Sequence, residues 1–131
     1  EALSSKGESP EEIAMFVEEF LKVAVKPELK YMRKPIIDVC GTGGDKLGMF
    51  NVSTAAVFVL AAGGCAVGKH GNRAVTSKCG GADVLEALGI NIEMGPDDFS
   101  QCVKSVGAGF LFAPNNHPAF KAVVPVRKLL A

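Results

Sequence analysis

Residues 36–45 read IIDVCGTGGD, and this stretch sets the architecture that we expect. Its first half, 36–40, is a short β-rich run that predicts a buried strand. Its second half begins a glycine-rich loop, after which Asn51 is a good N-cap for an apolar helix over 52–62. Because this helix is apolar on every side from residue 55 onward, we expect it to be buried as well.

The alternation of strand and helix continues along the chain. Further strands are expected at 65–69, 90–92 and 109–113. Further helices are expected at 82–88, 96–106 and 117–130, and Pro125 should kink or split the last of them. This order predicts an α/β fold, a parallel sheet flanked by helices with right-handed crossovers.

The first 31 residues have a different pattern, which is typical of an amphipathic helix. Ser9 and Glu12 are spaced as a capping box, and Pro10 suits the first helical position. Apolar side chains then recur at helical spacing, at Ile13, Phe16, Val17, Phe20, Leu21 and Ala24. One helix cannot bury such a stripe by itself, so its partners must lie elsewhere in the chain, in another subunit, or in a missing segment.

The composition excludes several classes of protein. Lys plus Arg and Asp plus Glu are balanced at 14 each, which argues against a nucleic-acid or membrane surface. No apolar run approaches the ~20 residues needed to span a bilayer. The four cysteines form no CxxC pair, so neither a metal cluster nor a disulfide framework is indicated, and we expect a cytoplasmic protein.

Two loops rich in hydrogen-bond donors are expected at one edge of the sheet. The first, 41–45, leads to Ser53 and Thr54 at the start of the apolar helix, where free N–H groups and the helix dipole favour phosphate. The second, 69–81, reads KHGNRAVTSKCGG. Because both loops leave the carboxyl ends of strands, together they predict a site for a ligand with several phosphate groups. A plain capped turn beside solvated surface charges remains the alternative.

Two familiar nucleotide sites are disfavoured. A Rossmann site requires an acidic residue ~20 positions downstream of the glycine-rich turn, whereas the second strand ends in Lys69 and His70. Residues 63–69 nearly match a P-loop, but His70 replaces the Ser or Thr that should bind Mg²⁺.

The motifs around these loops resemble those of the anthranilate phosphoribosyltransferase family. They are GTGGD (41–45), NVST (51–54), KHGNR (69–73), SKCGGADVLEALG (77–89), GFLFAP (109–114) and HPAFK to PVR (117–127). The resemblance implies a nucleoside phosphorylase or phosphoribosyltransferase-like catalytic domain, partial over 32–131, preceded by part of an N-terminal helical domain at 1–31. Family chains are more than twice as long, so the resemblance also implies a truncated chain.

The resemblance assigns roles to individual residues. Those implied to bind phosphoribosyl diphosphate are Gly41, Gly44, Asp45, Asn51, Ser53, Thr54, Lys69, His70, Gly71, Asn72, Arg73, Ser77 and Gly81. Those implied to contact anthranilate are Gly41, Asn72 and Arg127, and Ser53 is the implied ligand of Mg²⁺. Two positions depart from the family: Met49 stands where a threonine is usual, and Lys46 where a glycine is usual.

The implied reaction is the transfer of phosphoribose to the amino group of anthranilate in tryptophan biosynthesis. Mg²⁺, main-chain N–H groups and Lys69, the implied catalytic residue, would stabilise the charge on the departing diphosphate. We expect a homodimer at full length and an inactive chain in isolation, because the family's acidic Mg²⁺ ligands lie beyond Ala131. A pyrimidine nucleoside phosphorylase-like enzyme and a non-catalytic phosphate-binding fragment remain alternatives.

Overall fold

A computed structural model describes residues 2–29, 32, 34–41, 49–74 and 79–130 of the chain. The contacts divide the chain into two compact units. Residues 26–116 form one unit, and residues 1–25 group with residues 117–131 in the other. The division that we expected after residue 31 stays a prediction.

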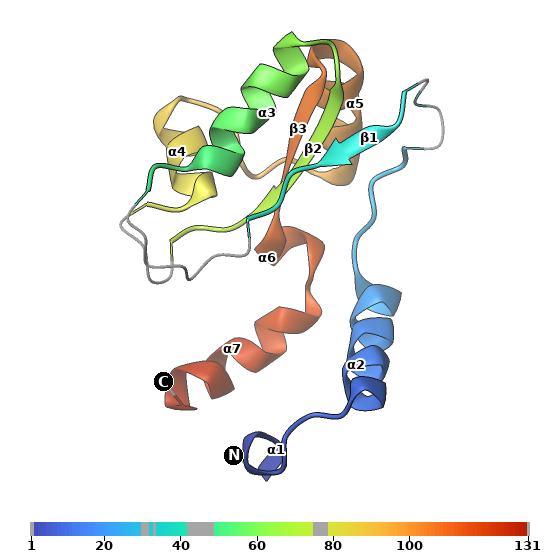
Figure 1. The fold of residues 1–131 in the computed structure, drawn as a ribbon, viewed down its shortest axis with the longest axis vertical. Helices are drawn as coiled ribbons and strands as arrows, with labels where there is room; N and C mark the ends of the chain where they lie inside the picture. The colour runs from blue at the N-terminus through green and yellow to red at the C-terminus, as the bar shows by residue number, and fades with distance from the viewer. Residues whose placement is uncertain (1, 30–31, 33, 42–48, 75–78, 131) are drawn as a thin grey trace. The chain divides into compact units, whose positions relative to one another are not determined.

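The larger unit contains a three-stranded parallel sheet, which confirms the expected fold class (Figure 1). Its strands are β1 (Ile36–Asp38), β2 (Ala66–Gly71) and β3 (Ala108–Phe112), paired in that order. The register places Ile36 beside Ala66, and Lys69 beside Phe110.

Two strand expectations were wrong. Strand β1 lies at an edge of the three-stranded sheet rather than in its interior, and Ile37 is 40% exposed. Residues 90–92 form no strand, because Asn91 Oδ1 accepts a hydrogen bond from the N–H of Glu93 at 2.9 Å and turns the chain. Ile92 is instead buried in the core beside Phe110.

Helices cover the two faces of the sheet. On one face α5 (Pro96–Val106) packs through Phe99 and Val103 onto Ala66. A Cβ at Gly109 would lie 2.7 Å from the Phe99 ring, so glycine is needed there for the helix to approach. On the other face, α4 (Gly81–Ala87) packs onto Phe110 and Phe112.

The apolar helix α3 (Val52–Ala62) has the bounds that we predicted, but its burial was overestimated. Only Thr54 and Val57 are buried, whereas Val59 is 71% exposed. The helix contacts β2, β3 and α4, and Val52, Phe58 and Val59 are exposed. Its end at Gly63 and Gly64 is as expected, with Gly64 at a φ of +86°.

Side chains alternate between the faces of a strand, and this alternation places Lys69. Ala66 faces α5, so Lys69, three residues further along β2, faces the side of α3 and α4. The strand runs to Gly71, two residues beyond the predicted end, so His70 and Gly71 belong to the strand rather than to the loop. A short helix that we did not predict, α6 (Ala113–Asn116), follows β3.

The smaller unit contains α1 (Ala2–Lys6), α2 (Pro10–Val23) and α7 (Ala119–Leu130). The capping box at the start of α2 is confirmed: Ser9 Oγ accepts from Glu12 N at 3.3 Å, and Glu12 Oε2 accepts from Ser9 N at 3.0 Å. Phe20 stacks on Phe120 with ring centroids 4.5 Å apart, although most of the apolar stripe of α2 is exposed. Pro125 lies inside α7 without splitting it. Among the described residues, no helix is long and apolar enough to cross a bilayer.

Candidate functional site

Lys69 lies at the centre of the candidate site, where β1 and β2 end and α3 begins. Its side chain is almost fully enclosed, with 4% of the residue exposed. The ammonium Nζ donates to Ser53 Oγ at 3.0 Å and to the backbone oxygen of Val39 at 3.4 Å. The segment after β1 and the end of β2 therefore meet at one place, as the sequence predicted.

Gly81 lies against this lysine, and Gly41 lies against the hydroxyl group to which the lysine donates. A Cβ built on Gly41 would lie 3.4 Å from Ser53 Oγ. A Cβ built on Gly81 would lie 3.1 Å from Thr54 Oγ1 and 3.3 Å from Lys69 Cε. The backbones of both loops thus pass close to the lysine and the hydroxyl groups, and main-chain N–H groups can face a ligand there.

Among the described residues, the hydroxyl of Thr54 has no hydrogen-bond partner, and the side chain of Asn51 does not cap α3. Thr54 is 2% exposed, and its hydroxyl has no hydrogen-bond partner among the described residues. A buried hydroxyl without a partner is costly, so such a group marks a place where a ligand is expected to bind. Asn51 occupies the predicted N-cap position, but its side chain makes no capping bond to the helix.

Burial controls the electrostatics of the lysine. Removal from water lowers the pKa of Lys69 below its ordinary value, while the nearby Cys40 and Asp38 raise it in part. A poorly hydrated ammonium group interacts more strongly with a bound anion than a solvated one does. An anion bound here would in turn favour the protonated lysine.

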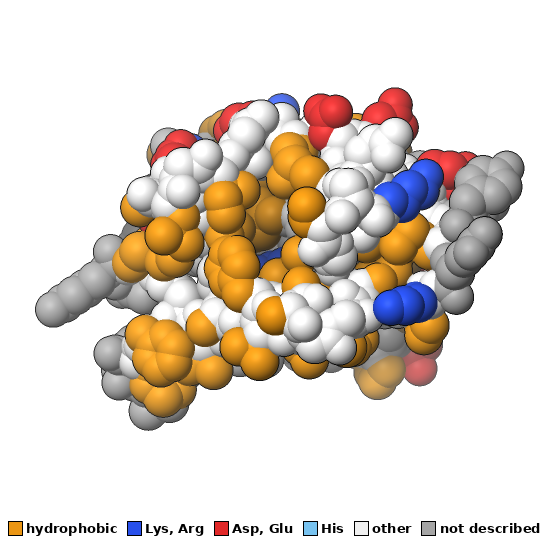
Figure 2. All heavy atoms as spheres, turned by 90° about the horizontal axis from the view of Figure 1, so that it is seen from above, with side chains coloured by type: hydrophobic (Ala, Val, Ile, Leu, Met, Phe, Trp, Pro, Cys, Tyr) orange, Lys and Arg blue, Asp and Glu red, His pale blue; other side chains and the backbone are white. Residues whose placement is uncertain are grey.

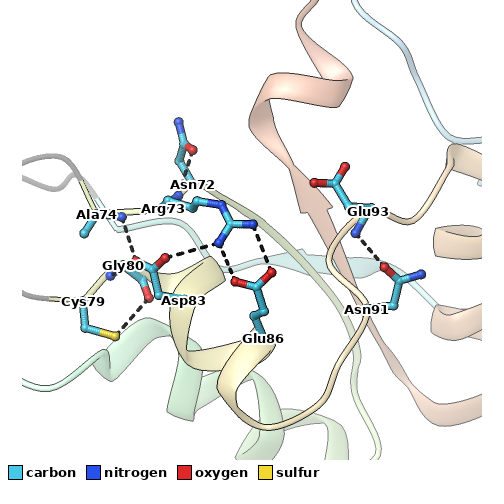
Figure 3. A network of polar contacts seen from close by, with 9 residues as sticks. All are labelled: Asn72, Arg73, Ala74, Cys79, Gly80, Asp83, Glu86, Asn91 and Glu93. Carbon is cyan, nitrogen blue, oxygen red and sulfur yellow. Dashed lines mark hydrogen bonds and ion pairs between the residues drawn. The ribbon is translucent and has the colours of Figure 1, made fainter.

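The side chain of Arg73 points toward Asp83 and Glu86 of α4 (Figure 3). Its guanidinium group forms a two-pronged pair with Glu86, with Nη2 to Oε1 at 3.0 Å and a second bond from Nη1 to Oε2. Nη1 also lies 3.7 Å from Asp83 Oδ1, and the group sits 5.6 Å from the centroid of the Phe112 ring. A contact from Arg73 to phosphate, as implied by the family resemblance, would require these carboxylates to release it.

The remaining predicted residues fall into three groups. Asn72 is exposed, and its Oδ1 accepts from Arg73 N at 2.8 Å, whereas His70 and Gly71 are half-buried in β2. Gly44, Asp45 and Ser77 lie outside the described residues, as does Lys46, while Met49 is exposed. Arg127 belongs to α7 in the other compact unit, and its side chain is not among those described.

The described residues do not make a magnesium site by themselves. They contain no group of three His, Cys, Asp or Glu side chains that could hold a metal ion. The predicted ligand, Ser53 Oγ, accepts a hydrogen bond from the ammonium group of Lys69, and a divalent cation on the same oxygen would be repelled by that charge. A metal here would depend on oxygen ligands from a bound substrate and from other residues.

Sequence reasoning did not predict an apolar cavity beside the lysine. On the face drawn in Figure 2, hydrophobic side chains gather around a hollow. A cavity of about 360 Å³ is lined by Lys69 and Thr54 together with apolar residues of α3, α4, α5 and β3. Its lining comes from five separate elements, β2 included, and from the segment between α4 and α5, so no local sequence signal identifies it.

Comparison with known proteins places this geometry in context. Residues 33–131 match the model of the glycosyl transferase family, a/b domain. An anthranilate phosphoribosyltransferase of Methanopyrus kandleri is 52% identical over 129 residues, and one of Synechocystis is 48% identical over 129 residues. These alignments cover 98% of this chain but 38% and 37% of the two relatives, so the chain spans well under half the length of the curated relatives it matches.

Solved structures agree with the sequence comparison. The anthranilate phosphoribosyltransferase of Thermus thermophilus superimposes with a TM-score of 0.84 at 48% identity, covering 99% of this chain and 39% of that one. The enzyme of Saccharomyces cerevisiae in complex with PRPP and Mg gives a TM-score of 0.80 at 32% identity, covering 92% of this chain and 33% of that one. The resemblance and the fold class predicted from the motifs are therefore confirmed.

Proposed function

This chain belongs to the glycosyl transferase family with an α/β domain, and we propose that the protein transfers phosphoribose from phosphoribosyl diphosphate to the amino group of anthranilate. Diphosphate is the other product, and the pathway served is tryptophan biosynthesis. The observation that carries the proposal is the convergence of Lys69, Ser53 and Thr54 between Gly41 and Gly81. The relatives named above support the choice of donor and acceptor.

The site suits a diphosphate donor for three reasons. Lys69 supplies a buried positive charge, which attracts a polyanion more strongly than a solvated lysine does. The hydroxyl of Thr54 is buried without a hydrogen-bond partner among the described residues, which is energetically unfavourable. A bound phosphate could accept its hydrogen bond and so remove this cost. The first turn of α3 adds free N–H groups and the positive end of the helix dipole.

The same groups would act on the transition state. As the bond between the ribose C1 and the diphosphate breaks, negative charge grows on the departing oxygen. Lys69 Nζ, held in place by Ser53 and Val39, would stabilise that charge without having to reorganise. The anthranilate nitrogen forms the new bond to C1 and then loses a proton. An aromatic amine is already a competent nucleophile, so the proposal assigns no strong general base.

The proposal extends to the acceptor, the metal ion and the assembly. Asn72 and Arg127 are assigned to anthranilate through the family resemblance, with Arg127 pairing with the carboxylate. Mg²⁺ is included because the yeast relative was solved with PRPP and Mg, and it would assist by neutralising diphosphate charge. A cytoplasmic homodimer remains our expectation.

Donor binding provides the most direct test. Titration calorimetry with phosphoribosyl diphosphate should show binding to the wild-type protein and a loss of at least about tenfold in affinity for Lys69→Met, which keeps the aliphatic volume and removes the charge. Lys104→Met removes an exposed lysine from α5 and serves as the matched control. The proposal fails if the wild-type protein does not bind the donor, or if both variants bind it as the wild type does.

A further inference from the structure

One carboxylate oxygen joins the end of β2 to the start of α4. Asp83 Oδ2 accepts hydrogen bonds from two backbone N–H groups, that of Ala74 at 2.9 Å and that of Gly80 at 2.7 Å (Figure 3). These residues stand on either side of positions 75–78, which lie outside the described residues. Asp83 is the third residue of α4, so the bond to Gly80 also caps that helix.

The two segments joined by Asp83 leave no space between them. A Cβ built on Gly80 would lie 2.4 Å from Ala74 N and 2.6 Å from the carbonyl carbon of Arg73. The backbone oxygen of Asn72 accepts from the N–H of Ala82 at 3.2 Å, a second direct link. Because the backbones touch, a change in either segment must move the other.

The next residue, Gly81, packs against the candidate site. A Cβ built on Gly81 would point at this site, because it would lie 3.1 Å from Thr54 Oγ1 and 3.3 Å from Lys69 Cε. We propose that Asp83 is a positioning residue of the donor site: by holding Gly80 against Ala74, it fixes Gly81 against Lys69 and Thr54. This inference rests on the proposed function, because it assigns the lysine and the hydroxyl to the diphosphate donor.

Asp83 is suited to this role and not to proton transfer. The N–H groups of Ala74 and Gly80 hold the pKa of the Asp83 carboxyl below its usual range, and the Arg73 guanidinium lowers it further. The carboxylate is therefore ionised at neutral pH, with one oxygen committed to two backbone donors. Glu86, on the same helix, pairs with Arg73 but not with either of these N–H groups, and thus provides a natural control.

The experiment compares Asp83→Ala, Asp83→Asn and Glu86→Gln with the wild-type protein. Calorimetry with inorganic diphosphate and with phosphoribosyl diphosphate gives affinity, hydrogen exchange reports the amides of Ala74 and Gly80, and a thermal melt reports folding. Asp83→Ala should weaken binding of both ligands by about tenfold and speed exchange at both amides. Asp83→Asn keeps an acceptor oxygen and should bind within about threefold of wild type. Glu86→Gln should bind within about twofold.

The outcomes separate this inference from the proposed function. Absence of diphosphate binding by the wild-type protein overturns the proposed function and this inference with it. Wild-type affinity in Asp83→Ala, with faster exchange at Ala74 and Gly80, overturns the positioning role alone, because Asp83 would then be only a helix cap. Failure of Asp83→Asn to restore binding, or an equal loss in Glu86→Gln, also overturns it. If Asp83→Ala does not fold, Asp83→Ser, whose shorter polar side chain cannot span both N–H groups, takes its place with the same expected loss of about tenfold and the same overturning result.

Discussion

The ammonium group of Lys69 donates to the hydroxyl of Ser53 at 3.0 Å, although one residue belongs to strand β2 and the other to the first turn of helix α3. This bond places a positive charge beside the end of a helix whose own dipole is positive there. The ammonium group and the positive end of the helix dipole repel each other unless an anion lies between them. The arrangement is thus disfavoured when empty and favoured when a polyanion is bound.

The lowered pKa of Lys69 makes donor binding sensitive to alkaline pH. Binding needs the ammonium form, so affinity for inorganic diphosphate should begin to fall at a lower pH than an ordinary lysine would allow. Stability should move in the opposite direction. Because burial disfavours the charged form in the folded state, the unfolded chain binds more protons between the two pKa values, and the free energy of unfolding should rise with pH in that window.

Calorimetry and denaturant unfolding across this pH range measure the two trends. In Lys69→Met the part of each trend that comes from this lysine should disappear, because no group titrates at this position. A wild-type protein whose affinity and stability rise or fall together above neutral pH would contradict the assignment.

The hydroxyl of Thr54 should contribute to binding at the expense of stability. Thr54→Val replaces it with a methyl group of similar volume, which removes a buried polar atom that has no partner among the described residues. We expect the free energy of unfolding to stay equal or rise by about 1 kcal/mol, while affinity for phosphoribosyl diphosphate falls about tenfold. Thr54→Ser, which keeps the hydroxyl, should retain affinity. Unfolding in urea and calorimetry measure both effects, and a loss of stability in Thr54→Val would count against a ligand-directed hydroxyl.

Substitution of Arg73 tests whether this residue binds phosphate, as the family resemblance implies, or only pairs with the carboxylates of α4. The guanidinium is engaged by Glu86 and Asp83, so Arg73→Met should alter donor affinity by no more than about threefold, far less than Lys69→Met. Calorimetry on the two variants side by side measures the difference. Equal losses would show that Arg73 leaves α4 to bind phosphate when the donor arrives.

The meeting of the two loops was predictable because parallel strands end at a common edge of the sheet. The composition of the loops then indicated the chemistry: Ser53 and Thr54 were predicted as ligand contacts from their place at the start of a helix, and Lys69 from its place at the end of a strand. The burial of Lys69 was not predictable. It depends on packing by Gly81, which is distant in sequence.

Errors arose where a local pattern was overridden by a distant contact or by a single side chain. The alternation at 90–92 is typical of a strand, yet Asn91 turns the chain by bonding to Glu93. The composition of α3 indicated burial, but a helix is buried only where another element covers it, and the outer side at Val59 is exposed. The phosphate contact of Arg73 stays a prediction, and in the structure its guanidinium group pairs with Glu86, 13 residues further along.

Substitutions at Gly80 and Gly95 form a matched pair that tests the close contact between the segment after β2 and the start of α4. Both precede a helix as the N-cap, with φ and ψ of −87° and 171° for Gly80 and −73° and 171° for Gly95, which alanine can adopt without strain. They differ in their surroundings. A Cβ on Gly80 would strike the backbone of Arg73 and Ala74, whereas a Cβ on Gly95 meets nothing within 4 Å.

Gly80→Ala should therefore lower the free energy of unfolding by about 1–3 kcal/mol and weaken donor binding, because backbone cannot move aside as a flexible side chain does. Gly95→Ala should change stability by less than about 0.5 kcal/mol and leave donor binding unchanged. Urea unfolding and calorimetry on the two variants measure these effects. Since the backbone conformations match, any difference between the variants reports the space around Gly80 and not a loss of chain flexibility. Equal stability of the two variants would mean that the segments at Gly80 and Ala74 lie further apart than described, and Asp83 would then have no close junction to hold.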